Sequence, residues 1–180
     1  MARDLLKASA PSRVVFLVNL DYRKLEKGLD FSNLNCEESY DKKMAFYASQ
    51  LANMLTVRYL SETLKGSGVT CNAVYPGVVS GTGIKRHMGV DKSITGNLLS
   101  KPLLWTVSKS VEQGAATPLF AMIDADVATA TGKLYSNKKE LDIDPVAQND
   151  AQAKKLFYVD QYWTGLISKE DLVKLQSKKS

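Results

Sequence analysis

Histidine and cysteine are scarce in this sequence, which restricts the metal and redox chemistry that it can perform. The 180 residues include one histidine, His87, and two cysteines, Cys36 and Cys71. The cysteines form no CxxC pair and neither lies near the histidine, so the ligand spacing of a zinc site is missing. We therefore expect no metal site and two reduced thiols, as in a reducing compartment.

Long apolar segments are missing as well. The longest apolar run, residues 97–107, is interrupted by Lys101 and Pro102, and a helix needs about 20 apolar residues to span a bilayer. The first residues show no secretory signal pattern. The sequence therefore predicts an intracellular protein, soluble or peripherally associated with a membrane, with no transmembrane segment in this chain.

The charge of the chain is moderately positive and evenly spread. The net charge is +5, and much of the excess comes from scattered lysines and from the tail at residues 174–179. No stripe of arginine and aromatic residues accompanies these lysines, so we expect solvated faces and no nucleic-acid partner. With 44% apolar residues, the chain can bury one core and is expected to form a single domain over residues 1–180.

Apolar patterning predicts alternating strands and helices. Val14–Val18 is apolar without alternation, which is typical of a strand covered on both faces. Apolar residues then recur at helical spacing from Lys42 to Lys65, and a second strand at Val69–Tyr75 ends at Pro76-Gly77. This order predicts an α/β fold with parallel strands and right-handed crossovers.

Weaker signals predict the remaining elements. Ser110 and Gln113 have the spacing of a capping box, which predicts a helix that ends near Ile123. The other predicted elements are an opening helix in residues 1–10, a short third strand and a turn within residues 131–143, a helix capped by Asp150 that reaches Trp163, and a short helix that begins at Ser168.

The segment Ala45–Leu55, which reads AFYASQLANML, is the centre of a wider resemblance. Together with the blocks that follow, in this order and spacing, it resembles the C-terminal half of the short-chain dehydrogenase/reductase family, in its retinol dehydrogenase-like branch. The resemblance runs from about residue 3 to about residue 166. The blocks are APSRVV (10–15), LDFSNLN (29–35), SQLANMLTVRYLSETLKGSGVTCNAVYPGVV (49–79), RHMG (86–89), VEQGAAT (111–117) and ATGKLYSNKKE (130–140).

This resemblance implies a fold and a chemistry. Members of the branch are oxidoreductases that use NADP or NAD and interconvert alcohols and carbonyls of retinoids and other apolar small molecules. The implied fold is an incomplete Rossmann-like, doubly wound parallel sheet with about three C-terminal strands and flanking helices. No strand is followed by a glycine-rich turn that would hold a pyrophosphate, and Gly81-Thr82-Gly83 follows the wrong strand. We therefore expect the Rossmann nucleotide-binding half to be absent and the cofactor not to be held tightly.

The family's catalytic positions are occupied by other residue types. The family helix reads Tyr-x-x-x-Lys: the phenol exchanges a proton with the substrate oxygen, and the lysine lowers its pKa and holds the nicotinamide ribose. Phe46 and Gln50 stand at these positions, and Asn19 stands where a serine would bind the carbonyl. Acid–base catalysis is typically worth about 10²–10⁴-fold, so the resemblance predicts a catalytic site that is not intact and a protein with little or no activity.

Three further features leave alternatives open. Tyr47 with Lys43, on the same helix face, is a possible substitute pair, although Leu51 stands at i+4 and Tyr47 should then face the core. Pro76, Gly77 and Val79 match the family turn beside the nicotinamide, where backbone groups meet the carboxamide, and Thr82 stands one residue later than the threonine expected there. A sharp turn after a strand explains Pro-Gly equally well. His87 is interpreted as a loop histidine.

Three functions are consistent with these observations. The first is a truncated, degenerate oxidoreductase, a pseudoenzyme. The second is an active retinoid or carbonyl reductase with a missing N-terminal extension, and the third is a non-catalytic partner of a full-length dehydrogenase. Val14–Val18 should lack a neighbour on one side, and unpaired strand edges associate. The helix from Lys42 to Lys65 corresponds to a helix that many family members use for dimer contacts, so we also expect possible dimerisation.

Overall fold

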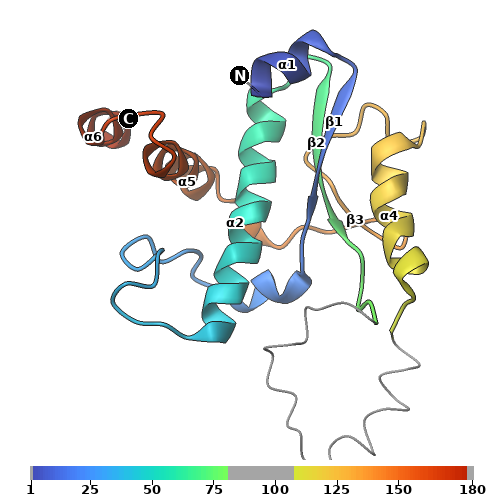
Figure 1. Ribbon diagram of the computed structural model, residues 1–180, viewed down its shortest axis with the longest axis horizontal. Coiled ribbons are helices and arrows are strands. Elements are labelled where there is room, and N and C mark those ends of the chain that lie inside the picture. The colour runs from blue at the N-terminus through green and yellow to red at the C-terminus, as the bar shows by residue number, and fades with distance from the viewer. Residues whose placement is uncertain (1, 81–107, 178–180) are drawn as a thin grey trace, which may run out of the picture.

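The computed structural model describes residues 2–80 and 108–177. Its elements alternate between strands and helices as the sequence predicts (Figure 1). In chain order they are α1 (Ala2–Ala8), β1 (Ser12–Leu17), η1 (Leu20–Lys24), α2 (Lys42–Thr63), β2 (Val69–Tyr75), α4 (Val111–Ile123), β3 (Leu134–Ser136), β4 (Lys139–Leu141), η3 (Pro145–Gln148), α5 (Asp150–Trp163) and α6 (Lys169–Ser177).

A single four-stranded sheet carries the fold, with the strand order β1-β2-β3-β4. β1 pairs with β2 and β2 pairs with β3, both in parallel, so that Val14 lies opposite Cys71 and Ala73 lies opposite Leu134. The parallel core confirms the incomplete Rossmann-like α/β fold. The sheet is mixed, however, because β4 returns antiparallel to β3 through Asn137 and Lys138, both at positive φ.

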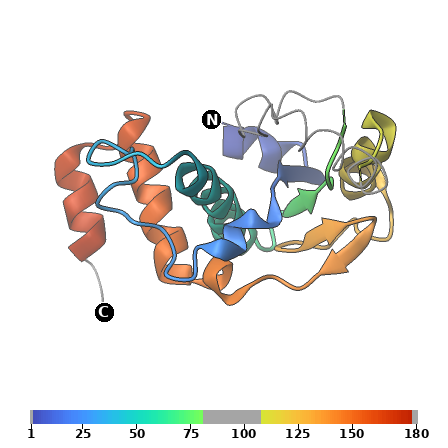
Figure 2. The ribbon, with the colours of Figure 1, turned by 90° about the horizontal axis from the view of Figure 1, so that it is seen from below.

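Helices cover both faces of the sheet, and the alternation of side chains along β1 shows which face each one covers (Figures 1 and 2). Val14 and Phe16 pack into the larger core beneath α2, whereas Val15 packs into a smaller cluster on the other face, with Ala121 of α4. Both faces of β1 are thus in contact with core residues, which explains its uninterrupted apolar sequence.

β1 is nevertheless an edge strand of the described sheet. β2 is buried along nearly its whole length, whereas β1 is half-buried and Leu17 is 57% exposed. The difference arises because β1 pairs with β2 on one side only. Its other side presents unpaired backbone groups, the feature by which strands add to one another.

The long helix α2 is anchored at its first turn. The Asp41 carboxylate accepts hydrogen bonds from the backbone N–H groups of Lys43 and Met44, both at 2.9 Å. These N–H groups have no partner within a helix, and their bonds to the carboxylate hold the pKa of Asp41 below its usual value. Gly66 and Gly68, both at positive φ, follow the end of the helix.

The structure corrects the predicted start of α5. The side chain of Asn149, not that of Asp150, caps the helix by accepting the N–H of Gln152 at 3.0 Å. Asp150 is the first helical residue, and its carboxylate forms an ion pair with Arg58 of α2 at 2.7 Å. Asparagine and aspartate are nearly equal as N-caps, so two adjacent candidates could not be separated by sequence pattern. The capping box of Ser110 and Gln113 is confirmed.

Candidate functional site

The predicted site residues lie at the carboxyl ends of the parallel strands, where α/β proteins bind their ligands. Asn19 follows β1 and Pro76 follows β2, while Phe46 and Gln50 belong to the first turns of α2. Figure 1 shows the ends of β1 and β2, η1 and the start of α2 at the same end of the molecule. Topology therefore gathers residues that are far apart in the sequence.

The structure brings two of the predicted positions into direct contact. The side-chain oxygen of Gln50 accepts a hydrogen bond from the backbone N–H of Asn19 at 2.8 Å. The amide nitrogen of Gln50 donates to the Ser49 hydroxyl at 3.1 Å. Both ends of the Gln50 side chain are thus occupied by the protein itself, and its role here is to fasten α2 to the end of β1.

Asn19 has a structural role as well. Its side-chain oxygen accepts the N–H of Asp21 at 2.8 Å and caps η1. Its side-chain nitrogen has no partner among the described residues. An amide NH2 group with two N–H donors therefore remains at the position where the family resemblance implies a serine hydroxyl.

Phe46 and Tyr47 are both half-buried and pack edge to face, with ring centroids 6.3 Å apart. The benzyl ring of Phe46 has no proton to exchange. Tyr47 does not belong to either buried core cluster, so the prediction that it faces the core is wrong. Its hydroxyl reaches a polar neighbour instead.

That neighbour is Lys24 of η1, not Lys43. The Lys24 ammonium lies 3.2 Å from the Tyr47 hydroxyl and 4.8 Å from the centre of its ring. It also forms an ion pair with Asp21 at 2.6 Å. The hydrogen bond to Asp21, and then that to Tyr47, raise the pKa of Lys24. The positive charge of Lys24 is therefore compensated by the Asp21 carboxylate.

A second tyrosine lies at this edge of the sheet. Tyr75, the last residue of β2, is half-buried. Burial, and then the negative charge of Asp21, raise the pKa of its phenol. Tyr75 therefore remains protonated at neutral pH and is not activated for proton transfer.

The turn after β2 is held closed by Lys109, which precedes α4. The Lys109 ammonium donates to the Pro76 carbonyl at 2.8 Å. Its backbone N–H donates to the Val78 carbonyl at 2.8 Å, and its carbonyl accepts the N–H of Ser80 at 3.0 Å. Gly77 is required here, because its φ is +89° and a Cβ would lie 2.9 Å from the Lys109 nitrogen.

Val79, in the same turn, is held in place by contacts with Lys109 and with α4. It bridges to Lys109 and packs over Gly114 of α4, where an added Cβ would lie 2.5 Å from a Val79 methyl carbon. The glycine within α4 thus makes room for the turn. Of the remaining predicted site residues, Thr82 lies outside the described residues, as do His87 and Gly81-Thr82-Gly83.

The side chains that the structure describes do not fit the nicotinamide end of a dinucleotide. The Gln50 amide is bonded at both ends, and the Pro76 carbonyl already accepts from Lys109. No cation stands at the position of Gln50 to hold a ribose. Among the described residues, the Gln50 amide and the Pro76 carbonyl, which the resemblance assigns to a cofactor, are bonded within the protein.

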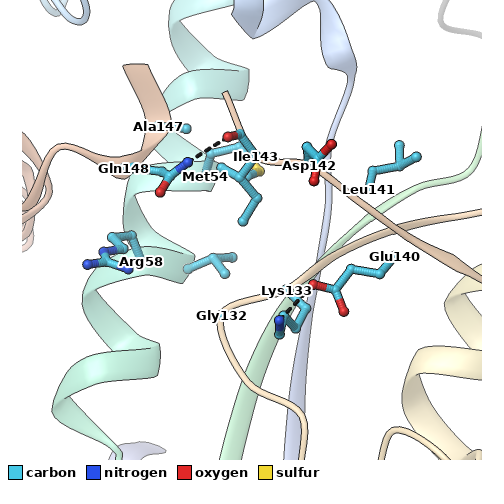
Figure 3. Close-up of a pocket in the computed structure, with 11 residues that line it drawn as sticks. Met54, Arg58, Gly132, Lys133, Glu140, Leu141, Asp142, Ile143, Ala147 and Gln148 are labelled. Carbon is cyan, nitrogen blue, oxygen red and sulfur yellow. Dashed lines mark hydrogen bonds and ion pairs between the residues drawn. The ribbon is translucent and has the colours of Figure 1, made fainter. Parts of the chain in front are cut away.

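A partly open pocket of about 240 Å³ lies away from these residues, between the middle of α2 and the segment that contains β4 and η3 (Figure 3). Met54 and Ile143 are among its apolar lining residues. Its charged lining residues are largely paired, Lys133 with Glu140 at 2.7 Å and Arg58 with Asp150. The pocket shares no residue with the predicted catalytic positions.

The described residues contain neither a candidate membrane span nor a candidate metal site. Within residues 2–80 and 108–177, no helix is both long enough and apolar enough to cross a membrane. In the same part of the chain, no three histidine, cysteine or acidic side chains are grouped as metal ligands.

Lys24, Tyr75 and Lys109 were missed by sequence reasoning. Lys24 stands in a polar stretch without periodicity, and Lys109 stands 33 residues beyond Pro76. Contacts over such separations leave no local pattern. Only Tyr75 had a usable signal, since the last residue of a strand at the carboxyl edge of a parallel sheet faces the ligand crevice.

Comparison with known proteins agrees with the arrangement of the elements. No family model matches the chain. Retinol dehydrogenase 14 from Mus musculus is 34% identical over 167 residues, which are 91% of this chain and 47% of that protein. Retinol dehydrogenase 13 from Homo sapiens is 34% identical over 164 residues, 91% of this chain and 49% of that protein.

A third relative is dehydrogenase/reductase SDR family member 13 from Bos taurus, which is 34% identical over 170 residues, 92% of this chain and 43% of that protein. The chain thus spans about half the length of the curated relatives it matches. Over some nine-tenths of its length, the sequence is related to the retinol dehydrogenase-like members of the short-chain dehydrogenase/reductase family and fits their C-terminal half.

Proposed function

We propose that this chain is a catalytically degenerate part of a retinol dehydrogenase-type oxidoreductase, with little or no turnover at the family's own catalytic positions. One observation carries the proposal: the Gln50 side chain bonds the Asn19 backbone at 2.8 Å, where the resemblance implies an ammonium beside a cofactor. Phe46, one turn earlier, has no exchangeable proton. Loss of positioned acid–base groups typically costs about 10²–10⁴-fold in rate.

The cofactor and the substrate follow from the same relatives. The proposed ancestral reaction is hydride transfer between NADP or NAD and an apolar alcohol or carbonyl of the retinoid type. Within this chain we expect at most weak dinucleotide binding, through the turn of Pro76, Gly77, Val79 and Thr82, because the described polar groups there are already bonded. The proposed domain organisation is one partial dehydrogenase/reductase domain over residues 1–180.

A titration with NADPH and an assay with all-trans-retinal test this function. NADPH is added to the longest natural polypeptide that contains this chain while the tryptophan fluorescence of the protein is followed. Retinal reduction by the same polypeptide is measured in parallel with that of a family enzyme whose catalytic tyrosine and lysine are intact. We expect turnover at least about a hundredfold below that enzyme. Turnover within tenfold of it would show an active reductase, the reading in which an N-terminal extension completes the site.

A triple variant, Asn19→Ser with Phe46→Tyr and Gln50→Lys, serves as the matched control. It restores the residue types that the family resemblance implies at all three positions. A gain in turnover over the unmodified chain, with the same cofactor affinity, would assign the deficit to these side chains. If the variant binds NADPH but its turnover does not increase, the deficit in activity would be assigned to another part of the protein.

The open edge of β1 favours a second candidate function, that of a non-catalytic partner. Leu17 is 57% exposed at the end of this strand, and one side of β1 is unpaired in the described sheet. A strand from a second copy or from a full-length dehydrogenase relative would satisfy those backbone groups. Tight association with such a relative, without NADPH binding, would support this role.

A further inference from the structure

An open pocket on the α4 side of the sheet has a lining without acidic residues. It has a volume of about 520 Å³, within the range of about 300–1,000 Å³ typical of small-molecule sites. The segment before α4, two turns of α4 and the β3–β4 turn each contribute to it. The polar lining residues are Ser108, Lys109, Gln113, Thr117, Asn137 and Lys138.

Two ammonium groups give this pocket its charge. Lys138 forms no side-chain hydrogen bond or ion pair with any described residue. Lys109 donates one hydrogen bond, to the Pro76 carbonyl, and a lysine ammonium has three donors. Positive charge without a lining carboxylate favours an anionic ligand.

The backbone holds these groups in place. Asn137 and Lys138 adopt positive φ values of 51° and 60° in the tight turn between β3 and β4. The turn is tied to α4, because the Lys138 N–H donates to the Thr117 hydroxyl at 3.3 Å. Thr117 is 1% exposed, so the hydrogen bond that holds the turn is made to a buried side chain.

Gln113 contributes a donor whose orientation is fixed. Its side-chain oxygen accepts the N–H of Ser110 at 2.9 Å in the capping box. Its side-chain nitrogen, which donates to no other described residue, is therefore the end left for a ligand. The Ser108 hydroxyl and the Asn137 amide add neutral donors.

We propose that this pocket binds the phosphate group of a small phosphorylated molecule. Two ammonium groups match the double charge of a phosphate monoester, and several donors around them match its three acceptor oxygens, whereas a carboxylate offers one charge and two oxygens. This pocket shares no residue with Asn19, Phe46 or Gln50, although its Lys109 also holds the turn after β2. The proposal therefore does not rest on turnover at those three positions.

A titration with inorganic phosphate tests the site. Amide signals of isotope-labelled protein are followed by NMR while phosphate replaces chloride at constant ionic strength and pH 7.5. We expect saturable shifts at Gln113 and Lys138, and weaker binding of acetate under the same conditions. No saturation, or acetate binding as tight as that of phosphate, would overturn the proposal.

Two lysine variants supply the matched comparison. Lys138→Gln removes a charged donor from the lining and should weaken phosphate binding roughly tenfold. Lys139→Gln removes the same charge from the next residue, which does not line the pocket, and should change affinity less than about twofold. Equal effects of the two variants would show unspecific attraction to a basic surface and would refute the site.

Discussion

At the scale of single residues, the side chains at the predicted catalytic positions have structural partners within the protein. Gln50 binds the Asn19 backbone, and Asn19 caps η1. The sequence predicted which residue types stand at these positions, because alignment to the family motif requires only spacing. It did not predict their hydrogen bonds, which depend on the separation of α2 from the end of β1.

The substitute pair illustrates the same limit. Tyr47 and Lys43 were paired in the prediction because they share a helix face, yet the Tyr47 hydroxyl contacts Lys24. Helical periodicity identifies neighbours within α2 but not residues of another segment that lie against it. Lys24 and Asp21 form a pair that became visible only with the fold.

The two thiols differ in burial, and their reactivity should differ accordingly. Cys71 is fully buried in β2, and burial raises its thiol pKa to about 12. Cys36 is half-exposed in an irregular segment. At pH 8 we expect one thiol to react rapidly with iodoacetamide and the second only after unfolding, since the thiolate is the reactive form.

Peptide mass mapping of the alkylated protein checks this assignment. Cys36→Ser should remove the rapid phase and Cys71→Ser should leave it intact. Equal rates for both cysteines in the folded protein would contradict the burial of β2.

At the scale of elements, the sequence predicted the helices and strands that have strong local signals, but it did not predict the shortest strand. The capping box of Ser110 and the strand Val69–Tyr75 were predicted at their observed places. β4 was not, because three residues, of which Lys139 and Glu140 are exposed, contain too few alternations to show a period. Its position is set by pairing with β3 through a two-residue turn.

The contact between α4 and the turn after β2 can be tested at Gly114. Alanine is favoured over glycine in a helix by about 1 kcal/mol, but the new methyl group would lie 2.5 Å from a Val79 methyl carbon. Crowding of a packed site typically costs about 1–3 kcal/mol. We expect Gly114→Ala to lower the free energy of unfolding, measured by urea denaturation, by about 1 kcal/mol.

A double variant separates the two effects. When Val79→Ala is added, the clash is removed and the helix preference for alanine should prevail. Gly114→Ala should then be stabilising relative to Val79→Ala alone, a coupling that a double-mutant cycle measures. Additive effects of the two changes would show that the residues do not touch.

At the scale of the whole molecule, the described sheet ends at β1, which has core residues on both faces and one unpaired side. The apolar run at Val14–Val18 predicted the coverage of both faces, since such runs occur in strands covered by helices, whereas the unpaired side was predicted from the family resemblance. The half-buried state of the strand and the exposure of Leu17 needed coordinates, because a sequence pattern does not show how much of an edge strand its neighbours cover.

Association through β1 should respond to charge at this edge. Leu17→Lys places an ammonium at an exposed position of the strand, and charges on edge strands oppose pairing. We expect the variant to shift the isolated chain from oligomers towards monomer in size-exclusion chromatography with light scattering, and to bind less of an apolar dye.

Leu5→Lys is the matched control, because Leu5 is 65% exposed on α1 and outside the sheet. It should change neither the mass nor dye binding. A chain that is monomeric before any substitution and unfolds cooperatively without binding the dye would refute association through this edge.

The bond between Gln50 and Asn19 also makes these two positions dependent on one another. Gln50→Lys alone would leave the Asn19 backbone amide without its acceptor, at a cost of about 1–3 kcal/mol. Phe46→Tyr alone would supply a phenol while the uncharged Gln50 stays one turn further along α2. We therefore expect neither substitution to create a proton-transfer site by itself, and the two to be needed together.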